Sequence, residues 1–366
     1  MRKKTVFVGI SGGVDSAVSA ALLKEQGYDV VGVFIRTWHP EFLECNEEEE
    51  RRDAMRVAAH LDIPFLTFDL QDVYKKEVAD YMIDEYKNGR TPNPDVMCNK
   101  EVKFGAFLKK AFAMGADYVA TGHYAQAKKM MLFRGNDVTK DQSYFLWTLN
   151  KTQLSKILFP IGHLPKSEVR KLAKKFKLPV AEKKDSQGIC FLGDIDLKEF
   201  LKHYIKEKRG KVLNENGEEI GYHDGVVFHT LGERRGFTII KKSPNDRAFY
   251  VVGKDLKKNI LIVSQDKNSF KKGLGSAAAR ARGIFQQKNI RALFESSFCL
   301  SLKNTNWIIT PKLDKKYTAQ VRYHGELLSC YVKKNQIIFE KPTLVDAGQS
   351  VVVYDGDICL GGGVVV

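Results

Sequence analysis

"GISGGVDSAVSAALL", residues 9–23, is the stretch that decides the fold of the first part of this 366-residue chain. It joins a β-branched apolar run, TVFVGI, to a helical pattern. Gly12 and Gly13 allow the backbone to approach a phosphate closely, and a helix that opens at Ser16 or Ala17 would direct its free N–H groups at that anion. The loop lacks the lysine that most phosphate-binding loops carry. The stretch therefore predicts a nucleotide-binding loop, with a strand-to-helix turn that holds no ligand as the alternative.

Short apolar runs alternate with amphipathic segments over roughly the first 120 residues. Alternation of this kind predicts a doubly wound parallel sheet with helices on both faces. Ligands of such sheets lie beyond the carboxyl ends of the strands, so the loops SGGVDS, TPNPDVMCNK and TGHY should face one crevice. The expected strands are 5–10, 29–38, 65–70 and 116–122, and the expected helices are 17–27, 47–63, 73–89 and about 100–114.

The pattern changes twice further along the chain. From Asp141 to about Lys208 it is helical, whereas after Gly210 short alternating strands are separated by Asn-Gly, Asp-Gly or lysine-rich turns. This texture predicts a small β-rich module and then a barrel or sandwich, which the final LGGGVVV would close as a strand. The stretch FKKGLGSAAARARG, 270–283, is the candidate boundary between them. We expect three domains, which are 1–205, 206–270 and 271–366.

The composition limits the class of protein. Hydrophobic residues make up 43% of the chain, which is enough for sizeable cores, and no run approaches the length of a membrane span. The N-terminal MRKKTVFVGI predicts a strand and not a secretion signal, so we expect a cytoplasmic protein without membrane association. The formal charge of +15, from 59 basic and 44 acidic residues, favours a polyanionic partner such as a nucleic acid. A basic surface that only maintains solubility is the alternative.

Cys98 is one of two cysteines, among six, with unusual neighbours. In GRTPNPDVMCNKEVKF two prolines fix an extended turn, and we expect the helix to start just after Cys98. A thiol at a helix N-terminus has its thiolate stabilised, and Lys100 and Lys103 should add to this effect. Asp95 is placed to hydrogen-bond the cysteine or to exchange a proton with a substrate.

Cys190, in EKKDSQGICFLGD, is the second. Gly188 should supply flexibility there, while Lys183 and Lys184 should supply positive potential. For either cysteine alone, an inert core thiol is the alternative. The spacing offers no metal-binding pair, and we interpret the other four cysteines as structural: Cys45, Cys299, Cys330 and Cys359.

The string SGGVDS resembles the PP-loop of the ATP pyrophosphatases. That likeness explains the missing lysine, because a PP-loop holds the departing pyrophosphate while the α-phosphorus is attacked. Together with the two cysteines, the chain resembles the bacterial tRNA-specific 2-thiouridylases nearly from end to end. The further motifs that carry this resemblance occur in the family's order: NPDVMCNKEVKFG, ATGHYA, KDQSYFL, DSQGICFLG, GYHDGVVFHTLGERRGF, VRYHG and AGQSVVVYDGDICLGGG.

The resemblance implies a fold and a reaction. The fold would be an α/β domain of the adenine nucleotide alpha hydrolase type with a helical insert, a small central β-rich domain and a C-terminal β-barrel. The wobble uridine of tRNA would be flipped into the crevice and adenylated on its C2 oxygen by ATP with Mg²⁺. Cys190 would then deliver sulfur as a persulfide, Cys98 would assist its release, and Asp95 would act as the acid/base. The products would be 2-thiouridine, AMP, pyrophosphate and a disulfide.

The resemblance also implies binding residues and partners, and no bound metal beyond Mg²⁺. Partners would be the tRNAs for Lys, Glu and Gln and a persulfide donor, either a relay protein or a cysteine desulfurase. The implied ATP-binding residues are Gly9, Ile10, Ser11, Gly12, Gly13, Val14, Asp15, Ser16, Phe34, Ile35 and Gly122. The implied tRNA-binding residues are Asn93, Pro94, Asp95, His123, Lys140, Asp141, Gln142, Arg322, Tyr323 and Gln349. Without the resemblance, Arg322 and Tyr323 could be solvent-facing strand residues, and His123 a capping or core histidine.

Three positions depart from the family pattern. Ile35 replaces a methionine against adenine and Gln187 replaces a threonine, both of which we interpret as neutral. Glu233 replaces a glutamine, and a carboxylate repels phosphate unless Arg234 or Arg235 neutralises it. Two other functions remain open: a PP-loop synthetase acting on a small metabolite, which would not need both thiols, and a nucleotide-regulated RNA-binding protein without turnover.

Overall fold

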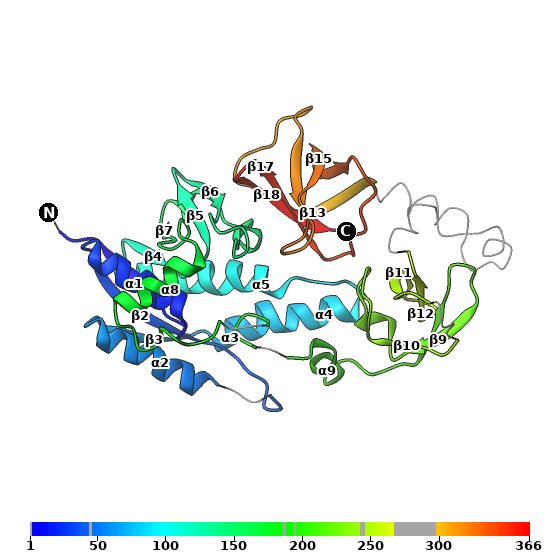
Figure 1. The fold of residues 1–366 in the computed structure, drawn as a ribbon, viewed down its shortest axis with the longest axis horizontal. Coiled ribbons are helices and arrows are strands. Elements are labelled where there is room, and N and C mark those ends of the chain that lie inside the picture. Colours follow the sequence, from blue (N-terminus) through cyan, green and yellow to red (C-terminus); the bar gives the residue numbers. More distant parts are fainter. Residues whose placement is uncertain (1, 44–45, 186–187, 194, 242–245, 267–297) are drawn as a thin grey trace.

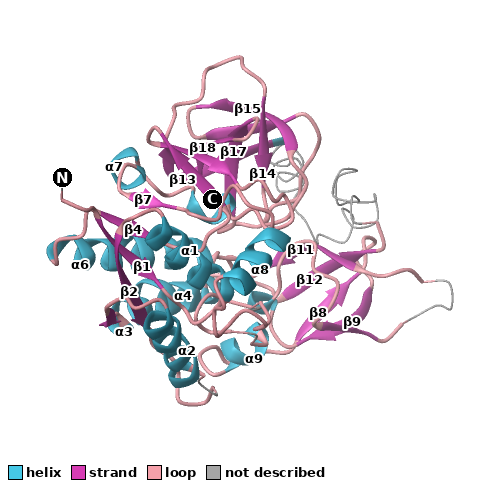
Figure 2. Cartoon of the chain, turned by 60° about the vertical axis from the view of Figure 1, so that its left-hand side comes forward, coloured by secondary structure: helices cyan, strands magenta, loops and turns pink. Residues whose placement is uncertain are grey.

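The computed structural model describes residues 2–43, 46–185, 188–193, 195–241, 246–266 and 298–366. An α/β part, a small β-rich module and a barrel follow one another along the chain. In Figure 1 the α/β part lies on the left, the module on the right and the barrel above them. Figure 2 shows the barrel over the α/β part from a second direction.

The α/β part is built on a five-stranded parallel sheet of order β3-β2-β1-β4-β7. Buried side chains lie on both of its faces: Ile35 packs with Phe7 and Phe68, while its neighbour Phe34 packs on the opposite face. The predicted doubly wound sheet is therefore confirmed. The elements are β1 Thr5–Gly9, α1 Val14–Glu25, β2 Asp29–Arg36, α2 Glu47–His60, β3 Phe65–Asp69, β4 Tyr118–Ala120, β7 Ile157–Leu158 and α8 Lys166–Lys175.

Two long helical stretches run from the sheet toward the other parts (Figure 1). Each contains a wide π-helical segment, a feature that often marks functional sites. Our expectation that the second helix starts after Cys98 is wrong, because the helix starts at Pro94. Proline is tolerated at the first helical position, since the N–H that it lacks would have no partner within the helix. The first stretch comprises α3 Gln71–Tyr74, η1 Lys75–Asp80 and α4 Tyr81–Lys87, and the second comprises α5 Pro94–Met97, η2 Cys98–Phe107 and α6 Leu108–Ala113.

The region that the sequence predicts as helical contains two further helices, α7 Lys151–Leu154 and α9 Leu197–Lys202, and a 3-10 turn, η3 Ser143–Leu146. It also contains β7, which the prediction missed. Before it, the hairpin of β5 Ala125–Lys128 and β6 Met131–Arg134 pairs with the last strand of the barrel through Leu132 and Phe133. This hairpin of the α/β part therefore extends the sheet of the barrel, separately from the parallel sheet. Local sequence pattern does not predict this pairing.

The C-terminal strands form a closed antiparallel barrel of order β13-β16-β15-β14-β17-β18, because β18 also pairs with β13. The final LGGGVVV lies in the closing strand, as predicted. Of the two predicted alternatives, the barrel is therefore confirmed and the sandwich is wrong. The strands are β13 Cys299–Trp307, β14 Tyr317–Gln320, β15 Leu328–Lys333, β16 Gln336–Phe339, β17 Ser350–Asp355 and β18 Ile358–Val365.

The central module is a mixed five-stranded sheet of order β10-β9-β8-β12-β11 with a small core of its own. The boundary that we predict at 270–283 lies outside the described residues, and the three domain ranges remain predictions. The elements are β8 Gly210–Leu213, β9 Glu219–His223, η4 Val226–Phe228, β10 Phe237–Ile239, β11 Tyr250–Asp255 and β12 Ile260–Ser264.

One buried ion pair ties the three parts together. Lys254 of the module lies 2.6 Å from Asp346 of the barrel, and their side chains are only 8% and 4% exposed. The Lys254 ammonium also donates to the carbonyl of Gly89, and Asp346 accepts from the hydroxyl of Thr91, so the α4–α5 loop joins the same contact. Charges this deeply buried require such pairing, and the junction fixes how the three parts meet.

Among the described residues, no helix is long and apolar enough to cross a membrane. Cys330 and Cys359 are buried in barrel strands and Cys299 is half-buried, in agreement with a structural interpretation. Cys45 lies outside the described residues, as does Gln187.

Candidate active site

The nucleotide loop lies at the carboxyl end of β1, where the sequence predicts it. Helix α1 starts at Val14, earlier than expected, and Gly13 occupies its N-cap. Gly12 has φ +76°, and a Cβ there would lie 2.5 Å from the Glu50 carbonyl oxygen, so only glycine fits. The Ser16 hydroxyl accepts from the Ser11 N–H (3.2 Å) and donates to the Gly13 carbonyl (3.1 Å), which holds the loop open around the helix N-terminus. The arrangement suits an anion.

A lysine reaches this loop from far along the chain. Lys166 Nζ lies 2.7 and 2.9 Å from the two carboxylate oxygens of Asp15, and the Tyr124 hydroxyl donates to the same carboxylate at 2.8 Å. Lys166 also pairs with Asp185 at 2.8 Å. Lys140 and Arg170 also pair with Asp185. Burial raises the pKa of Asp185, but the hydrogen bonds from Lys140 and Lys166 outweigh this effect and lower it to about 2. Sequence reasoning missed Lys166, because nothing local links α8 to the loop.

Gly122 packs against the nucleotide loop, and the next residue, His123, lies in the core. A Cβ on Gly122 would lie 2.6 Å from the Ser16 backbone nitrogen, so glycine permits this close approach. His123 is 7% exposed, bonds Thr121 at 2.7 Å and lies beside Phe104, while burial pushes its pKa well below the ordinary range. It is therefore a neutral core histidine, which is the alternative stated from the sequence and does not support contact with tRNA.

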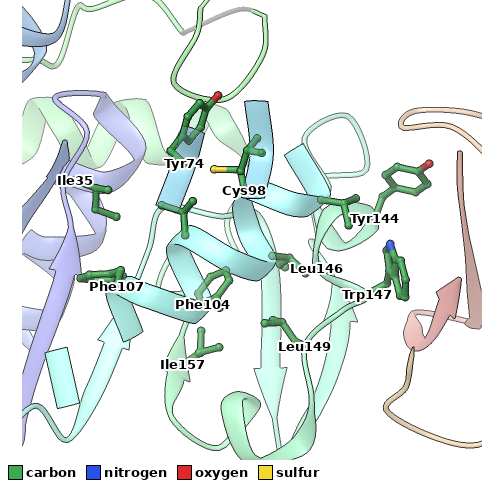
Figure 3. Packing of buried hydrophobic residues seen from close by; sticks show 14 of the residues in the cluster. Ile35, Tyr74, Cys98, Phe104, Phe107, Tyr144, Leu146, Trp147, Leu149 and Ile157 are labelled. Carbon is green, nitrogen blue, oxygen red and sulfur yellow. The ribbon is translucent and has the colours of Figure 1, made fainter. Parts of the chain in front are cut away.

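Ile35, expected against adenine, has a buried side chain that is 7% exposed (Figure 3). Phe34 is buried on the other face of the sheet. Neither side chain lies open at the edge, so any contact with adenine at this point of β2 would be made by the backbone. The adenine contact stays a prediction.

The two cysteines meet. The sulfur of Cys98 lies 3.5 Å from that of Cys190, although 92 positions separate them in sequence. Cys98 begins η2 and is buried in the cluster that contains Tyr74 and Phe104 (Figure 3). The separation is a contact between two free thiols and not a disulfide bond, whose sulfurs lie about 2 Å apart. A thiol pair in contact can form and break such a bond with little movement.

Cys190 sits in a tight turn that three side chains hold. Its backbone N–H donates to Asp95 (2.8 Å), its carbonyl accepts from the Tyr74 hydroxyl (2.8 Å), and the Phe191 carbonyl lies 2.7 Å from a His39 ring nitrogen. Phe191 has φ +68°, an uncommon conformation for a residue with a side chain, which these anchors maintain. Tyr74 and His39 were not predicted from the sequence, because they reach the turn from distant segments, α3 and the β2–α2 connection.

The two thiols are electrostatically different. The hydrogen bond from Cys98, followed by the Lys103 ammonium, lowers the pKa of the Cys190 thiol to about 7 against the opposing effect of burial. Burial and the neighbouring Cys190 raise the pKa of Cys98 well above its ordinary value. We expected the thiolate on Cys98, and this is wrong: the favoured thiolate is that of Cys190, because the Cys98 thiol is the hydrogen-bond donor. Burial also raises the pKa of Asp95, although the Cys190 N–H opposes this shift.

The expected lysine contacts are partly corrected. Lys103 lies beside the thiol pair, 5.6 Å from the Phe191 ring centre. Lys100 instead pairs with Glu101 at the surface, and Lys183 pairs with Asp53 at 2.8 Å. Gly188 has φ +91°, so it supplies a conformation that favours glycine.

A pocket of about 230 Å³ lies between the start of α5 and the barrel. It brings together four of the predicted tRNA-binding residues from three distant segments. The Tyr323 ring packs against the Phe145 ring, with 4.3 Å between ring centres and 43° between the ring planes, so it is not a free solvent-facing side chain. Arg322 is exposed and donates to the Leu231 carbonyl. The lining residues are Pro92, Asn93, Tyr144, Arg322, Tyr323, Gln349 and Ser350.

Pro94 and Asp95 follow directly on the pocket-lining Asn93, whose side chain caps α5 by accepting from the Val96 N–H. In the Lys-Asp-Gln run, Lys140 pairs with Asp185, and Asp141 is buried against Arg134 at 2.8 Å. Gln142 accepts from the backbone N–H of Tyr124. Because Asp141 is buried and paired with Arg134, its role is structural, and its burial does not support direct contact with tRNA.

Glu233 does not face outward as a free carboxylate. It accepts from the Thr230 N–H at 2.9 Å and lies 3.4 Å from a ring nitrogen of His229. The concern that it repels phosphate is thereby weakened. Beside it, Arg234, Arg235 and Arg247 line a pocket of about 520 Å³ in the module.

The nucleotide loop at the end of a parallel sheet and the facing pair of thiols define an α/β protein of the PP-loop type. Family models described as tRNA methyl transferase HUP domain, tRNA methyl transferase PRC-barrel domain and Aminomethyltransferase beta-barrel domain match residues 4–194, 198–265 and 297–365. The chain belongs to the family of the tRNA-specific 2-thiouridylases, and the predictions of this family and of an enzyme are confirmed.

The assignment to this family rests on the similarity of the chain to proteins named tRNA-specific 2-thiouridylase MnmA. Those of Streptococcus thermophilus (strain LMD-9) and Oceanobacillus iheyensis are both 44% identical to the chain. The alignments cover 99% and 98% of this chain and 95% and 94% of theirs. A solved 4-thiouridine synthetase–RNA complex with bound ATP is 20% identical over 55% of this chain and 50% of its own, with a TM-score of 0.35.

Proposed function

We propose that this enzyme converts the wobble uridine of tRNA to 2-thiouridine, using ATP for activation and a cysteine persulfide as the sulfur source. The observation that carries the proposal is the contact between Cys98 and Cys190, of which only Cys190 has a lowered thiol pKa. Two such thiols are what sulfur transfer needs, since one carries the atom and the other discharges it. The names of the relatives support the same activity.

The first step is activation of the base. The C2 oxygen of uridine attacks the α-phosphorus of ATP, an O–P bond forms, and pyrophosphate leaves. A carbonyl oxygen is a poor leaving group, whereas AMP is a good one. The nucleotide would lie on residues 9–16 and against Gly122, with the phosphates at the N-terminus of α1.

The second step moves sulfur. The terminal sulfur of a Cys190 persulfide attacks C2, and AMP departs with the bonding electron pair. The Cys98 thiolate then attacks the Cys190 Sγ, and the S–S bond to the transferred atom breaks. The transferred sulfur is reduced and the two cysteines are oxidised to a disulfide, which a thiol reductant must reopen. The proton of Cys98 goes to a base, for which Asp95 is the adjacent carboxylate.

Mg²⁺ would enter with ATP, and Asp15 fits as its ligand. A carboxylate is the oxygen donor that Mg²⁺ prefers, and the Asp15 side chain is 31% exposed at the loop. It would bind the ion, and Mg²⁺ would neutralise phosphate charge. Among the described residues no group of three or more His, Cys, Asp or Glu could hold a separate metal ion.

The tRNA would bind across the parts of the chain, with the base in the pocket beside Asn93 and Tyr323. Taking a base out of a single-stranded loop costs a few kcal/mol, which contacts and the basic surface can offset. The selection of tRNAs for Lys, Glu and Gln, a relay protein or cysteine desulfurase as donor, and a cytoplasmic location belong to the same proposal.

Three other activities are open to test. The matching family models are described by methyl transfer, which needs no pair of thiols in contact. A small-metabolite synthetase of the PP-loop type would equally leave the second thiol without a role. A nucleotide-regulated RNA-binding protein without turnover disagrees with the enzyme that the relatives' names give, and it would bind tRNA without forming pyrophosphate.

The decisive experiment incubates the purified chain with unmodified tRNA, Mg-ATP and a persulfide donor, and analyses the nucleosides by mass spectrometry. We expect 2-thiouridine at the wobble position, with one AMP and one pyrophosphate for each sulfur inserted and no product without ATP. A methylated nucleoside, or tRNA binding without pyrophosphate release, would contradict the proposal.

A further inference from the structure

Lys166 lies at the nucleotide loop, a position that no local sequence pattern predicts. It is 151 positions from Asp15, yet its ammonium contacts both oxygens of that carboxylate. The loop itself has no lysine between residues 9 and 16. Lys166 therefore brings a positive charge to a loop whose own sequence lacks one.

The position of Lys166 is built into the fold. It is the first residue of α8, which packs on α1. Val169 and Ala173 of α8 belong to the same buried cluster as Val14 and Val18 of α1. Its backbone N–H donates to a carboxylate oxygen of Asp137 at 2.9 Å, which fixes the start of the helix.

The ammonium of Lys166 is held without being sealed off. The side chain is 14% exposed and lies 5.8 Å from the ring centre of Tyr124. Asp15 and Asp185 contact it from two sides, while Lys140 and Arg170 also pair with Asp185. Asp137 lies near the same cations, so three cations face three carboxylates, and a bound phosphate would take the place of the Asp15 carboxylate beside Lys166.

We propose that Lys166 binds the β- and γ-phosphates of ATP and holds the departing pyrophosphate. This inference rests on the proposed function, of which it specifies the phosphate-binding cation. Without nucleotide, Asp15 is the partner of Lys166. With Mg-ATP bound, Asp15 would hold Mg²⁺ and the Lys166 ammonium would donate to phosphate oxygens, while its pair with Asp185 would keep it over the loop. A positioned lysine suits phosphate as a compact point charge with three donors.

The test measures ligand binding by the full chain in the absence of tRNA, by titration calorimetry with Mg-pyrophosphate, Mg-ATP and AMP. For Lys166→Met we expect affinity for pyrophosphate and ATP to fall roughly ten- to a hundredfold, the effect of losing a charged hydrogen bond. Affinity for AMP, which has no β- or γ-phosphate, should change less than about threefold. Lys166→Arg should retain most of the affinity. The control Lys171→Met removes an equal charge from α8 at a side chain that is 75% exposed, and should match the native chain.

Equal loss of AMP and pyrophosphate binding by Lys166→Met would assign Lys166 a structural role and overturn the inference, as would unchanged pyrophosphate binding. In case that variant does not fold, the native chain is labelled with an adenosine diphosphopyridoxal reagent, reduced and mapped. Label on Lys166 that pyrophosphate prevents supports the inference, and label elsewhere overturns it. A native chain that binds neither ATP nor pyrophosphate would overturn the proposed function as well, whereas a Lys166 result alone leaves it standing.

Discussion

Replacing Cys190 by serine is expected to abolish sulfur insertion, by at least about a thousandfold, because a hydroxyl cannot carry a transferable sulfur atom. The fold should persist, since the turn is held by backbone bonds to Asp95 and Tyr74 that serine retains. Release of pyrophosphate with tRNA should continue for one turnover, because activation precedes sulfur transfer. AMP should stay on the activated base, because it leaves only when sulfur attacks C2. Thiolated nucleoside, pyrophosphate and tRNA affinity are measured on one preparation.

A matched control for this variant is Cys299→Ser, which changes a half-buried thiol in the barrel. It should thiolate tRNA at the native rate. If Cys190→Ser retains thiolation, the carrier is another group. If it loses tRNA binding as well, Cys190 serves the structure and the persulfide step must be abandoned.

Replacing Cys98 by alanine should stop turnover after sulfur has been loaded, with a loss of about a hundredfold or more, because no second thiol remains to break the persulfide. The variant should also change the acidity of Cys190. The Cys98 hydrogen bond is the main cause that lowers the Cys190 pKa to about 7, so its loss should raise that pKa toward 9.0. A raised pKa leaves less thiolate at neutral pH, since a thiol ionises only above its pKa.

The measurement is the pH dependence of Cys190 alkylation by iodoacetamide, followed by peptide mapping. The native chain should give a midpoint near pH 7, and Cys98→Ala a midpoint higher by about a unit or more. In a separate loading reaction, persulfide should accumulate on Cys190 of the variant. An unchanged midpoint together with native turnover would mean that the contact between the two sulfurs has no chemical role.

Much of the fold follows from local pattern. The alternation of strands and helices and the loop at 9–23 suffice for the parallel sheet, and LGGGVVV suffices for a closing strand. What pattern cannot give is pairing between distant segments. The hairpin β5–β6 joins the barrel through Leu132 and Phe133, and two short runs of apolar residues carry no sign of which sheet they will extend.

In the candidate site, too, some features could be predicted from the sequence and others could not. The resemblance to a family picked out Cys98 and Cys190 as partners, and their sulfurs are in contact. The expected helix N-terminus favoured a thiolate at Cys98, whereas the structure favours one at Cys190, because the acidity depends on the direction of one hydrogen bond. Lys166 was missed for a related reason, since its role depends on α8 packing against α1.

The central claim, that Cys98 and Cys190 act together in one sulfur transfer, is tested most directly in a single turnover. The native chain, loaded with one persulfide and freed of donor and reductant, is mixed with tRNA and Mg-ATP, quenched under alkylating conditions and mapped by mass spectrometry. We predict a Cys98–Cys190 disulfide peptide that forms at the same rate as 2-thiouridine and in equal amount. The prediction would be contradicted if 2-thiouridine formed and the quench still alkylated both cysteines, because both thiols would then have remained free.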